Sequence, residues 1–104
     1  MIQAISVDTN NGVLALETIR RIHQEFPGVN TICGLSNVSF GLPNRFLLNR
    51  TFLVLCIGAG LSGAILDPLD KKMMTNIIVA ETLVGRDDFC LNYLKAIRAG
   101  TVVD

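Results

Sequence analysis

The segment Gly34–Arg45 constrains the fold more than any other part of the sequence. It joins a short apolar run, Thr31–Cys33, to a long apolar run that begins near Phe46, and it carries the polar pair Ser36-Asn37 among glycines and a proline. In α/β proteins a buried strand leads through such a loop into a helix, and groups that handle ligands gather there. The segment therefore predicts a strand–loop–helix unit with its functional side chains in the loop.

The same alternation of helix and strand extends along most of the chain. Residues 13–26 place apolar side chains on one helical face, and a strand is expected over about residues 30–34. The apolar run then predicts a helix over 46–59 and a strand over 63–66. Strands separated by helices run parallel and read as fully buried apolar runs. The fold class is therefore α/β with parallel strands.

The last third of the sequence predicts helices only. After a turn at Asp67–Asp70, with Asp70 as the helix cap, a helix is expected over 71–84. A last helix is expected over about 89–99, capped by Asp87 or Asp88, and the residues after it are expected to fray.

The composition favours a chain that works with another polypeptide. Its 104 residues suffice for one small domain, yet half of them are apolar, the mean hydropathy is +0.48 and only 17% are charged. A domain of this size buries only about two-thirds of its unfolded surface. So much apolar surface is hard to hide in a compact monomer. We expect the chain to pair with itself or another chain or, in the interpretation we favour, to be part of a larger protein.

Charge and cysteine usage exclude several classes of function. Nine basic and nine acidic residues give no net charge and no basic patch, so nucleic acid is not an expected partner. Cys33, Cys56 and Cys90 are widely spaced among apolar neighbours, which indicates buried free thiols in a reducing, cytoplasmic compartment. The apolar run Phe52–Leu66 is interrupted by glycines and is shorter than the roughly 20 residues of a membrane span. We expect no membrane association.

Four strings of residues carry a resemblance to a known family. They are the loop sequence Gly34-Leu-Ser-Asn-Val-Ser-Phe-Gly41, the helix start Asn49–Phe52, the pair of segments at 59–61 and 64–67, and the ending Tyr93–Gly100. Over essentially the whole chain they resemble the pterin-binding methyltransferases, the group of the methyltetrahydrofolate:corrinoid/iron-sulfur protein methyltransferases and the folate domain of cobalamin-dependent methionine synthase.

The resemblance implies an incomplete C-terminal portion of a (β/α)8 barrel. A whole barrel takes about 250 residues, so this chain would begin after strand six and hold strands seven and eight at residues 31–34 and 63–66. We therefore expect residues 1–104 to be one segment of a pterin-binding barrel domain, inactive alone. Its partners would be the missing N-terminal barrel half, or a second copy, and a corrinoid protein. Without that half, the flank of strand seven would be exposed and the chain would associate.

The family reaction transfers the N5 methyl group of methyltetrahydrofolate to the cobalt of a cobalamin-type corrinoid, which a partner protein carries. N5 leaves poorly unless it gains positive character, and an Asn amide can donate a hydrogen bond that strengthens in the transition state. By resemblance, Asn37 is the catalytic residue that contacts N5. Satisfying the backbone of its own loop is the alternative role for this side chain.

Four further residues are candidate substrate contacts, Ser36, Phe40, Arg45 and Asp67. The resemblance implies an arginine near the substrate at position 45 and places Phe40 where some relatives carry a polar Gln, whereas Asp67 is a candidate because it ends strand eight on the same face as Asn37. Arg45 stands at a helix start, where the helix dipole disfavours a cation, so it needs a compensating group such as a carboxylate or carbonyl of the folate. Phe40 would form a stacking wall or pack in the loop. Ser36 and Asp67 also suit ordinary turn chemistry. No residues suggest a metal site.

Two alternative functions remain open. A dihydropteroate synthase-like enzyme would have basic residues after strand seven and an Arg-x-His pattern at strand eight, where this chain has Ser36-Asn37 and Asp67-Pro68. A small non-catalytic α/β interaction module would explain the apolar composition equally well, and it would not bind a pterin.

Overall fold

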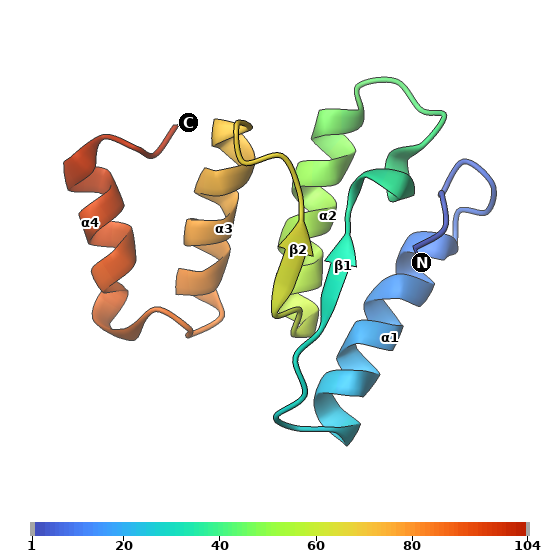
Figure 1. Ribbon diagram of the computed structural model, residues 1–104, viewed down its shortest axis with the longest axis horizontal. Helices are drawn as coiled ribbons and strands as arrows, with labels where there is room; N and C mark the ends of the chain where they lie inside the picture. The colour runs from blue at the N-terminus through green and yellow to red at the C-terminus, as the bar shows by residue number, and fades with distance from the viewer. Residues whose placement is uncertain (1, 104) are drawn as a thin grey trace. The chain divides into compact units, whose positions relative to one another are not determined.

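The computed structural model describes residues 2–103, which form two compact units, one that extends to Leu66 and one that begins at Asp67 (Figure 1). The first unit contains helix α1 (Asn11–Glu25), strand β1 (Ile32–Gly34), the short 3-10 helix η1 (Ser36–Ser39), helix α2 (Arg45–Ala59) and strand β2 (Gly63–Ile65). The second contains helix α3 (Lys71–Leu83), the 3-10 helix η2 (Asp88–Cys90) and helix α4 (Leu91–Ala99). The expected order of helices and strands is confirmed.

The two strands pair in parallel, with α2 as the connection between them. Ile32 lies opposite Gly63, and Gly34 lies opposite Ile65. Just before β1, the carbonyl of Thr31 accepts the N–H of Gly63 at 2.9 Å. Parallel strands need such a crossover because a tight turn cannot reverse the chain between them. The prediction of an α/β fold with parallel strands is therefore confirmed.

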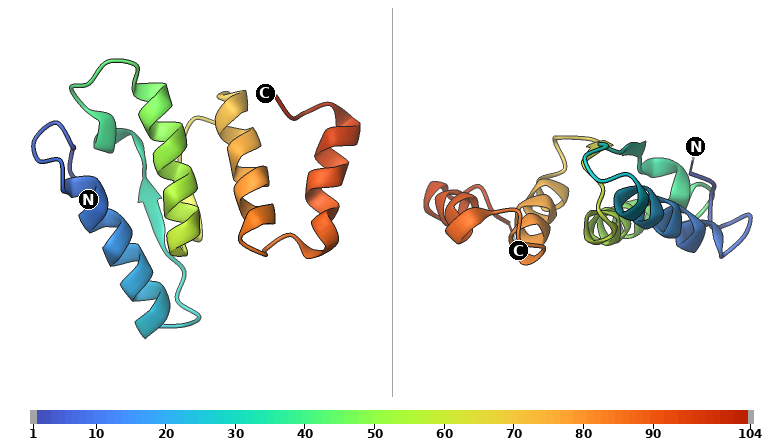
Figure 2. Two further views of the ribbon diagram at one scale, coloured as in Figure 1. Left: turned by 180° about the vertical axis from the view of Figure 1, so that it is seen from behind. Right: turned by 90° about the horizontal axis from the view of Figure 1, so that it is seen from below.

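Both helices of the first unit lie on one face of this sheet. α1 packs against α2, and the views from behind and from below show the two helices on the same side of the strands (Figure 2). The buried side chains of α2 include Phe52, Leu53 and Cys56, and Leu35 of the β1–η1 connection is also buried. The apolar core of this unit therefore lies between the sheet and the two helices.

Within the described residues of the first unit, no helix covers the other face of the sheet. Ile32 and Ile65 are 71% and 72% exposed, whereas Cys33, whose side chain points to the opposite face, is half-buried. Successive side chains of a strand point to opposite faces, and helices cover only one of them here. The expectation that both strands are fully buried is therefore wrong for this chain.

The end of α2 depends on Gly60. Its backbone has φ of 110°, a left-handed conformation, and the N–H groups of Gly60 and Leu61 donate to the carbonyls of Ile57 and Cys56 at 3.0 Å each. This is the glycine cap that the sequence predicts. A Cβ on Gly60 would also lie 2.6 Å from Cγ of His23, on α1. Gly60 therefore both turns the chain into β2 and lets α1 approach α2 closely.

Replacing Gly60 by Ala is expected to lower the free energy of unfolding by about 1–3 kcal/mol, because a side chain at this φ is strained and meets His23. Gly58→Ala is the matched control, since Gly58 lies within α2 with open space around its Cβ position. It should raise stability by roughly 0.5–1 kcal/mol. Urea titrations of the two variants and the parent chain measure both effects, and equal effects would contradict this role for Gly60.

Aspartate caps organise the second unit. Asp70 accepts the N–H of Met73 at 3.1 Å, as expected for the cap of α3. At α4 the capping residue is Asp87, which is buried and accepts the N–H groups of Asn92 and Tyr93 at 2.9 Å each. These two bonds, with one from the Thr82 hydroxyl at 3.3 Å, lower the pKa of Asp87 below its usual value.

The segment after α4 is tied to α3. The N–H of Val103 donates to Oγ1 of Thr75 at 3.0 Å, and the N–H of Thr101 donates to the carbonyl of Ala96 at 3.2 Å. The expectation that this tail frays is therefore wrong for residues 101–103. Thr75 is buried and polar, and this backbone contact explains why a threonine is tolerated there.

The lowered pKa of Asp87 predicts a pH dependence for the second unit. The carboxylate stabilises the folded state fully above the unfolded pKa of about 3.9, and this contribution is lost as the pH falls through the lower, folded value. Asp87→Asn should lower the free energy of unfolding at neutral pH and make it less dependent on pH in the acid range. Unfolding followed by circular dichroism from about pH 2 to about pH 7, which spans the titration of a carboxyl group, measures both effects. Asp88→Asn is the control, because Asp88 is exposed.

Candidate functional site

The polar loop residues lie at the carboxyl end of β1. η1 begins two residues after Gly34, and it carries Asn37, whose side chain is half-buried. Nδ2 of Asn37 donates to the carbonyl of Ile2, and the N–H of Ile5 donates to the carbonyl of Val38 at 3.0 Å. Asn37 thus holds the N-terminal segment against η1. One N–H of its amide is engaged in this bond, and the amide also carries a second N–H donor and the acceptor Oδ1.

A cleft of about 960 Å³ runs between α1 and β1. Its walls are mostly apolar and include Leu14, Ile19 and Ile22 from α1 and Ile32 from β1. Ser36 and Asn37 border the cleft beside the carboxyl end of β1. The cleft therefore combines an apolar body with polar groups at one end, the usual composition of a small-molecule or peptide site.

The positive charge of Arg45 is stabilised by groups of the loop that precedes α2. Its Nε donates to Oγ of Ser39 at 3.0 Å, one of its terminal N–H groups donates to the carbonyl of Ser36, and its guanidinium lies 5.9 Å from the ring centre of Phe40. These contacts supply the acceptors that a cation at a helix start needs. A folate carboxylate is therefore not required to explain the position of Arg45, although the exposed side chain is accessible to a ligand.

Ser39 is the centre of this cluster. It is 0% exposed, and its Oγ lies 2.7 Å from Oδ1 of Asn49 and 3.1 Å from the carbonyl of Ser36 while it accepts from Arg45. One hydroxyl hydrogen serves the two acceptors in turn. Ser39 therefore links the start of α2 to η1, which keeps Asn37 at the end of β1.

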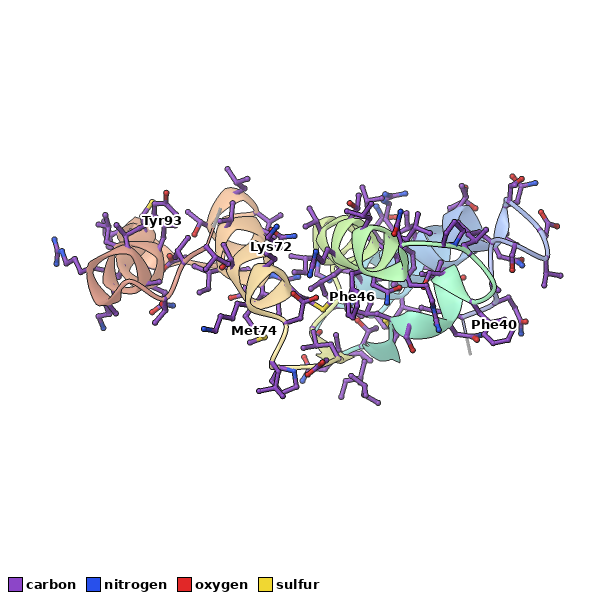
Figure 3. The ribbon with its side chains drawn as sticks, turned by 90° about the horizontal axis from the view of Figure 1, so that it is seen from above. Phe40, Phe46, Lys72, Met74 and Tyr93 are labelled. Carbon is purple, nitrogen blue, oxygen red and sulfur yellow. The ribbon has the colours of Figure 1, made fainter. Side chains whose placement is uncertain are left out.

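The predicted site residues separate into three groups. Ser36 and Asn37 border the cleft, whereas Arg45 and Phe40 lie next to the same loop without lining it. The Phe40 ring is 61% exposed at the turn after η1 (Figure 3). Asp67 begins the second unit, where its carboxylate accepts the N–H of Leu69 at 2.9 Å, the contact of an ordinary turn.

Two polar residues of α1 that sequence reasoning missed also line the cleft, Asn11 and Thr18. Nδ2 of Asn11 donates to the carbonyl of Ala4 at 2.9 Å, and the Thr18 hydroxyl donates to the carbonyl of Leu14 at 2.8 Å. Thr18 stands four residues from both Leu14 and Ile22, on the apolar face of the helix. That spacing was the available signal for its position.

Cys33 and Cys56 form a hydrogen-bonded thiol pair between β1 and α2. The bond from Cys56 lowers the pKa of Cys33, against the effect of burial, whereas the same bond and then burial raise the pKa of Cys56. Cys33 is half-buried and lines the cleft, whereas Cys56 is fully buried, so the Cys33 thiol is the more accessible of the two. Cys90 is exposed, so the expectation of a buried thiol is wrong at that position.

Within residues 2–103, no group of three or more His, Cys, Asp or Glu side chains is arranged to hold a metal ion. Over the same residues, no helix is long and apolar enough to span a membrane.

Ser39→Ala should lower the free energy of unfolding by about 1–3 kcal/mol, because Asn49 and Arg45 both lose a partner at a buried position. Ser36→Ala is the control, because its contacts with Ser39 and Arg45 are made by the backbone carbonyl, which alanine keeps. Its effect should stay within about 0.5 kcal/mol. Thermal melts of the two variants compare them directly, and a Ser36 effect as large as that of Ser39 would contradict the described cluster.

Comparisons with known proteins identify similar sequences. The chain is 35% identical over 101 residues, 97% of its own length, to a methylcorrinoid:tetrahydrofolate methyltransferase of Eubacterium limosum, of which it covers 37%. Over 57 residues, 53% of its length, it is 46% identical to the methionine synthases of Mycobacterium tuberculosis and Mycobacterium leprae, of which it covers 5% each. No protein-family model matches the chain. The chain thus spans well under half the length of the curated relatives that it matches.

Proposed function

Because this chain belongs, over the part that it covers, to the pterin-binding methyltransferase family, we propose that it forms the C-terminal part of a methyltransferase barrel. In the complete barrel it takes part in transferring the N5 methyl group of methyltetrahydrofolate to the cobalt of a corrinoid. The corrinoid is carried by a partner protein and acts as a substrate of the barrel. A catalyst lowers the barrier in both directions, so the same site serves the reverse transfer from a methylcorrinoid to tetrahydrofolate.

The arrangement of the first unit supports the barrel. Its two parallel strands have both helices on one face, and the exposed Ile32 and Ile65 stand on the other. In a (β/α)8 barrel the helices surround the strands, and branched apolar side chains fill the interior in layers. Ile32 and Ile65 have the residue type and the orientation of such a layer. Strands from the rest of the barrel would cover them.

The position of Asn37 is the single observation that carries the proposed chemistry. It follows the carboxyl end of β1, half-buried at the rim of an apolar cleft. Active sites of this barrel fold lie at the carboxyl ends of the strands. In our proposal, the amide of Asn37 donates a hydrogen bond to N5 that strengthens as the methyl group leaves, without any change in the charge of the side chain.

The other loop residues position Asn37 and the substrate. Ser39 and Arg45 hold η1 against the start of α2, and the exposed guanidinium of Arg45 can also meet an anionic or carbonyl group of the folate. In the proposal, Phe40 offers a ring edge beside that group and Ser36 contributes a hydroxyl. Asp67 stays a predicted substrate contact. The free thiols of the three cysteines agree with the proposed cytoplasmic location.

Asn37→Ala in the complete barrel should lower kcat for methyl transfer by about 10²–10³-fold, the cost of removing one donor to a developing charge. Asn92→Ala is the matched control, because Asn92 is exposed on α4, does not line the cleft and should leave kcat unchanged. Transfer is followed from the absorbance of the corrinoid at fixed partner concentration. An unchanged rate with Asn37→Ala would remove this residue from the mechanism, and complete barrels that bind no pterin would favour a non-catalytic interaction module.

A further inference from the structure

Two cysteines of the first unit face each other between β1 and α2, and the proposed methyl transfer uses neither of them. Cys33 lies on the face of the sheet that the helices cover, because Ile32 beside it points to the opposite face. Cys56 lies among the buried side chains of α2. The two thiols are hydrogen-bonded to each other. They therefore form a dithiol pair within one layer of the fold.

Backbone contacts also bring the two elements together at this pair. The carbonyl of Cys56 accepts the N–H of Leu61 at 3.0 Å, and the next N–H along the chain, that of Ser62, donates to the carbonyl of Thr31 at 3.1 Å. Thr31 precedes Cys33 by two residues. The turn after α2 is therefore bonded both to the helix at Cys56 and to the chain that enters β1. A disulfide requires such a close approach of two backbones.

The two thiols differ in access and in acidity. Cys33 is half-buried and lines the cleft, whereas Cys56 is 0% exposed. The hydrogen bond from Cys56 lowers the pKa of Cys33, against the effect of burial, and the same bond raises the pKa of Cys56. The thiolate is the form that attacks an oxidant, and redox-sensitive cysteines combine access and a lowered pKa with a second cysteine beside them. An oxidant from solution therefore meets Cys33 first.

We propose that Cys33 and Cys56 are a site of reversible oxidation, at which a small hydroperoxide converts the two thiols into a disulfide. The thiolate of Cys33 attacks one oxygen of the peroxide. The O–O bond breaks, the sulfur becomes a sulfenic acid, and the second oxygen leaves as hydroxide or alkoxide and takes up a proton.

Cys56 completes the reaction. Its sulfur attacks the sulfur of Cys33, so that an S–S bond forms and the S–O bond breaks. The departing hydroxide takes the proton of the Cys56 thiol and leaves as water, which allows a buried thiol of raised pKa to react. The two sulfurs together lose the two electrons that reduce the peroxide, and a dithiol reductant returns them by exchange.

The disulfide closes a covalent loop around the polar cluster of the candidate site. Residues 34–55 lie between the two cysteines, and they include Asn37, Ser39 and Arg45. Oxidation thus joins β1 to α2, the two elements that η1 connects. The inference goes beyond the proposed function and does not depend on it, because it concerns thiols of the chain itself.

Tryptic mapping of the folded chain after treatment with hydrogen peroxide tests the site. Trypsin cleaves after Lys and Arg, so the three cysteines fall in different peptides, residues 22–45, 51–71 and 87–95. Mass spectrometry without reductant should find the first peptide linked to the second, in a yield that does not depend on the concentration of the chain. Dithiothreitol should restore both free thiols.

The same chain unfolded in urea is the control for proximity. There the pairing follows loop length, and the loop from Cys33 to Cys56 is similar in length to the loop from Cys56 to Cys90. The two links should therefore form in yields within about twofold of each other. In the folded chain, the Cys33–Cys56 link should be the single intramolecular one.

Two variants separate the roles of the thiols. Cys56→Ala removes the second thiol, so peroxide should leave Cys33 as a sulfenic acid that dimedone traps, with loss of the internal link. Cys90→Ala is the matched control, because Cys90 is exposed and lies in the second unit, and it should leave the link unchanged. If Cys56→Ala does not fold, the peptide map of the parent chain still decides.

Three results would overturn the inference. The first is a free Cys33 at a dose of peroxide that oxidises the exposed Cys90. The second is a sulfinic acid on Cys33 while Cys56 stays a free thiol. The third is a folded chain in which peptide 87–95 is linked to either partner as often as in urea. The methyl-transfer assay is separate, since a barrel that transfers no methyl group leaves this peptide map unchanged.

Discussion

The parallel pairing of β1 with β2 is the constraint on which the first unit depends. Parallel strands cannot be joined by a tight turn, so α2 must run back along the sheet between them. Gly60 then has to reverse the chain within a residue or two, in a conformation that other residues adopt only with strain. The close contact of α1 with this turn follows from the missing side chain at Gly60.

The pairing also fixes the position of the candidate site. It aligns the carboxyl ends of the two strands, and η1 follows the end of β1 directly. The buried hydroxyl of Ser39 then connects η1 to Arg45 and Asn49 at the start of α2. The contacts of Ser39 with Arg45 and Asn49 hold η1, and with it Asn37, in position. A flexible loop would position an amide for a developing charge less well, because preorganisation is what makes such a hydrogen bond effective.

The apolar composition and the bare face of the sheet have one physical explanation in the proposed function. A chain that supplies part of a barrel carries the apolar residues of an interior that it cannot enclose alone. In that proposal, the missing part of the barrel accounts for the exposure of Ile32 and Ile65 and for the edge of β1 that has no strand partner within residues 2–103. The same features would be a hazard in an independent domain, where uncovered edges and apolar faces promote association.

Local sequence signals determined the order of the helices and strands and where the helices end. The glycine at position 60, the aspartate cap at 70 and the apolar runs at the two strands predicted element order, strand direction and the helix end correctly, because each acts through neighbours in the chain. The string Leu35–Ser39 also carried the family resemblance. Which residues meet across the fold was decided by tertiary structure alone. Arg45 is satisfied by Ser36, Ser39 and Phe40, Thr18 faces the cleft, and Ile32 is bare, because these outcomes depend on which surfaces the helices cover.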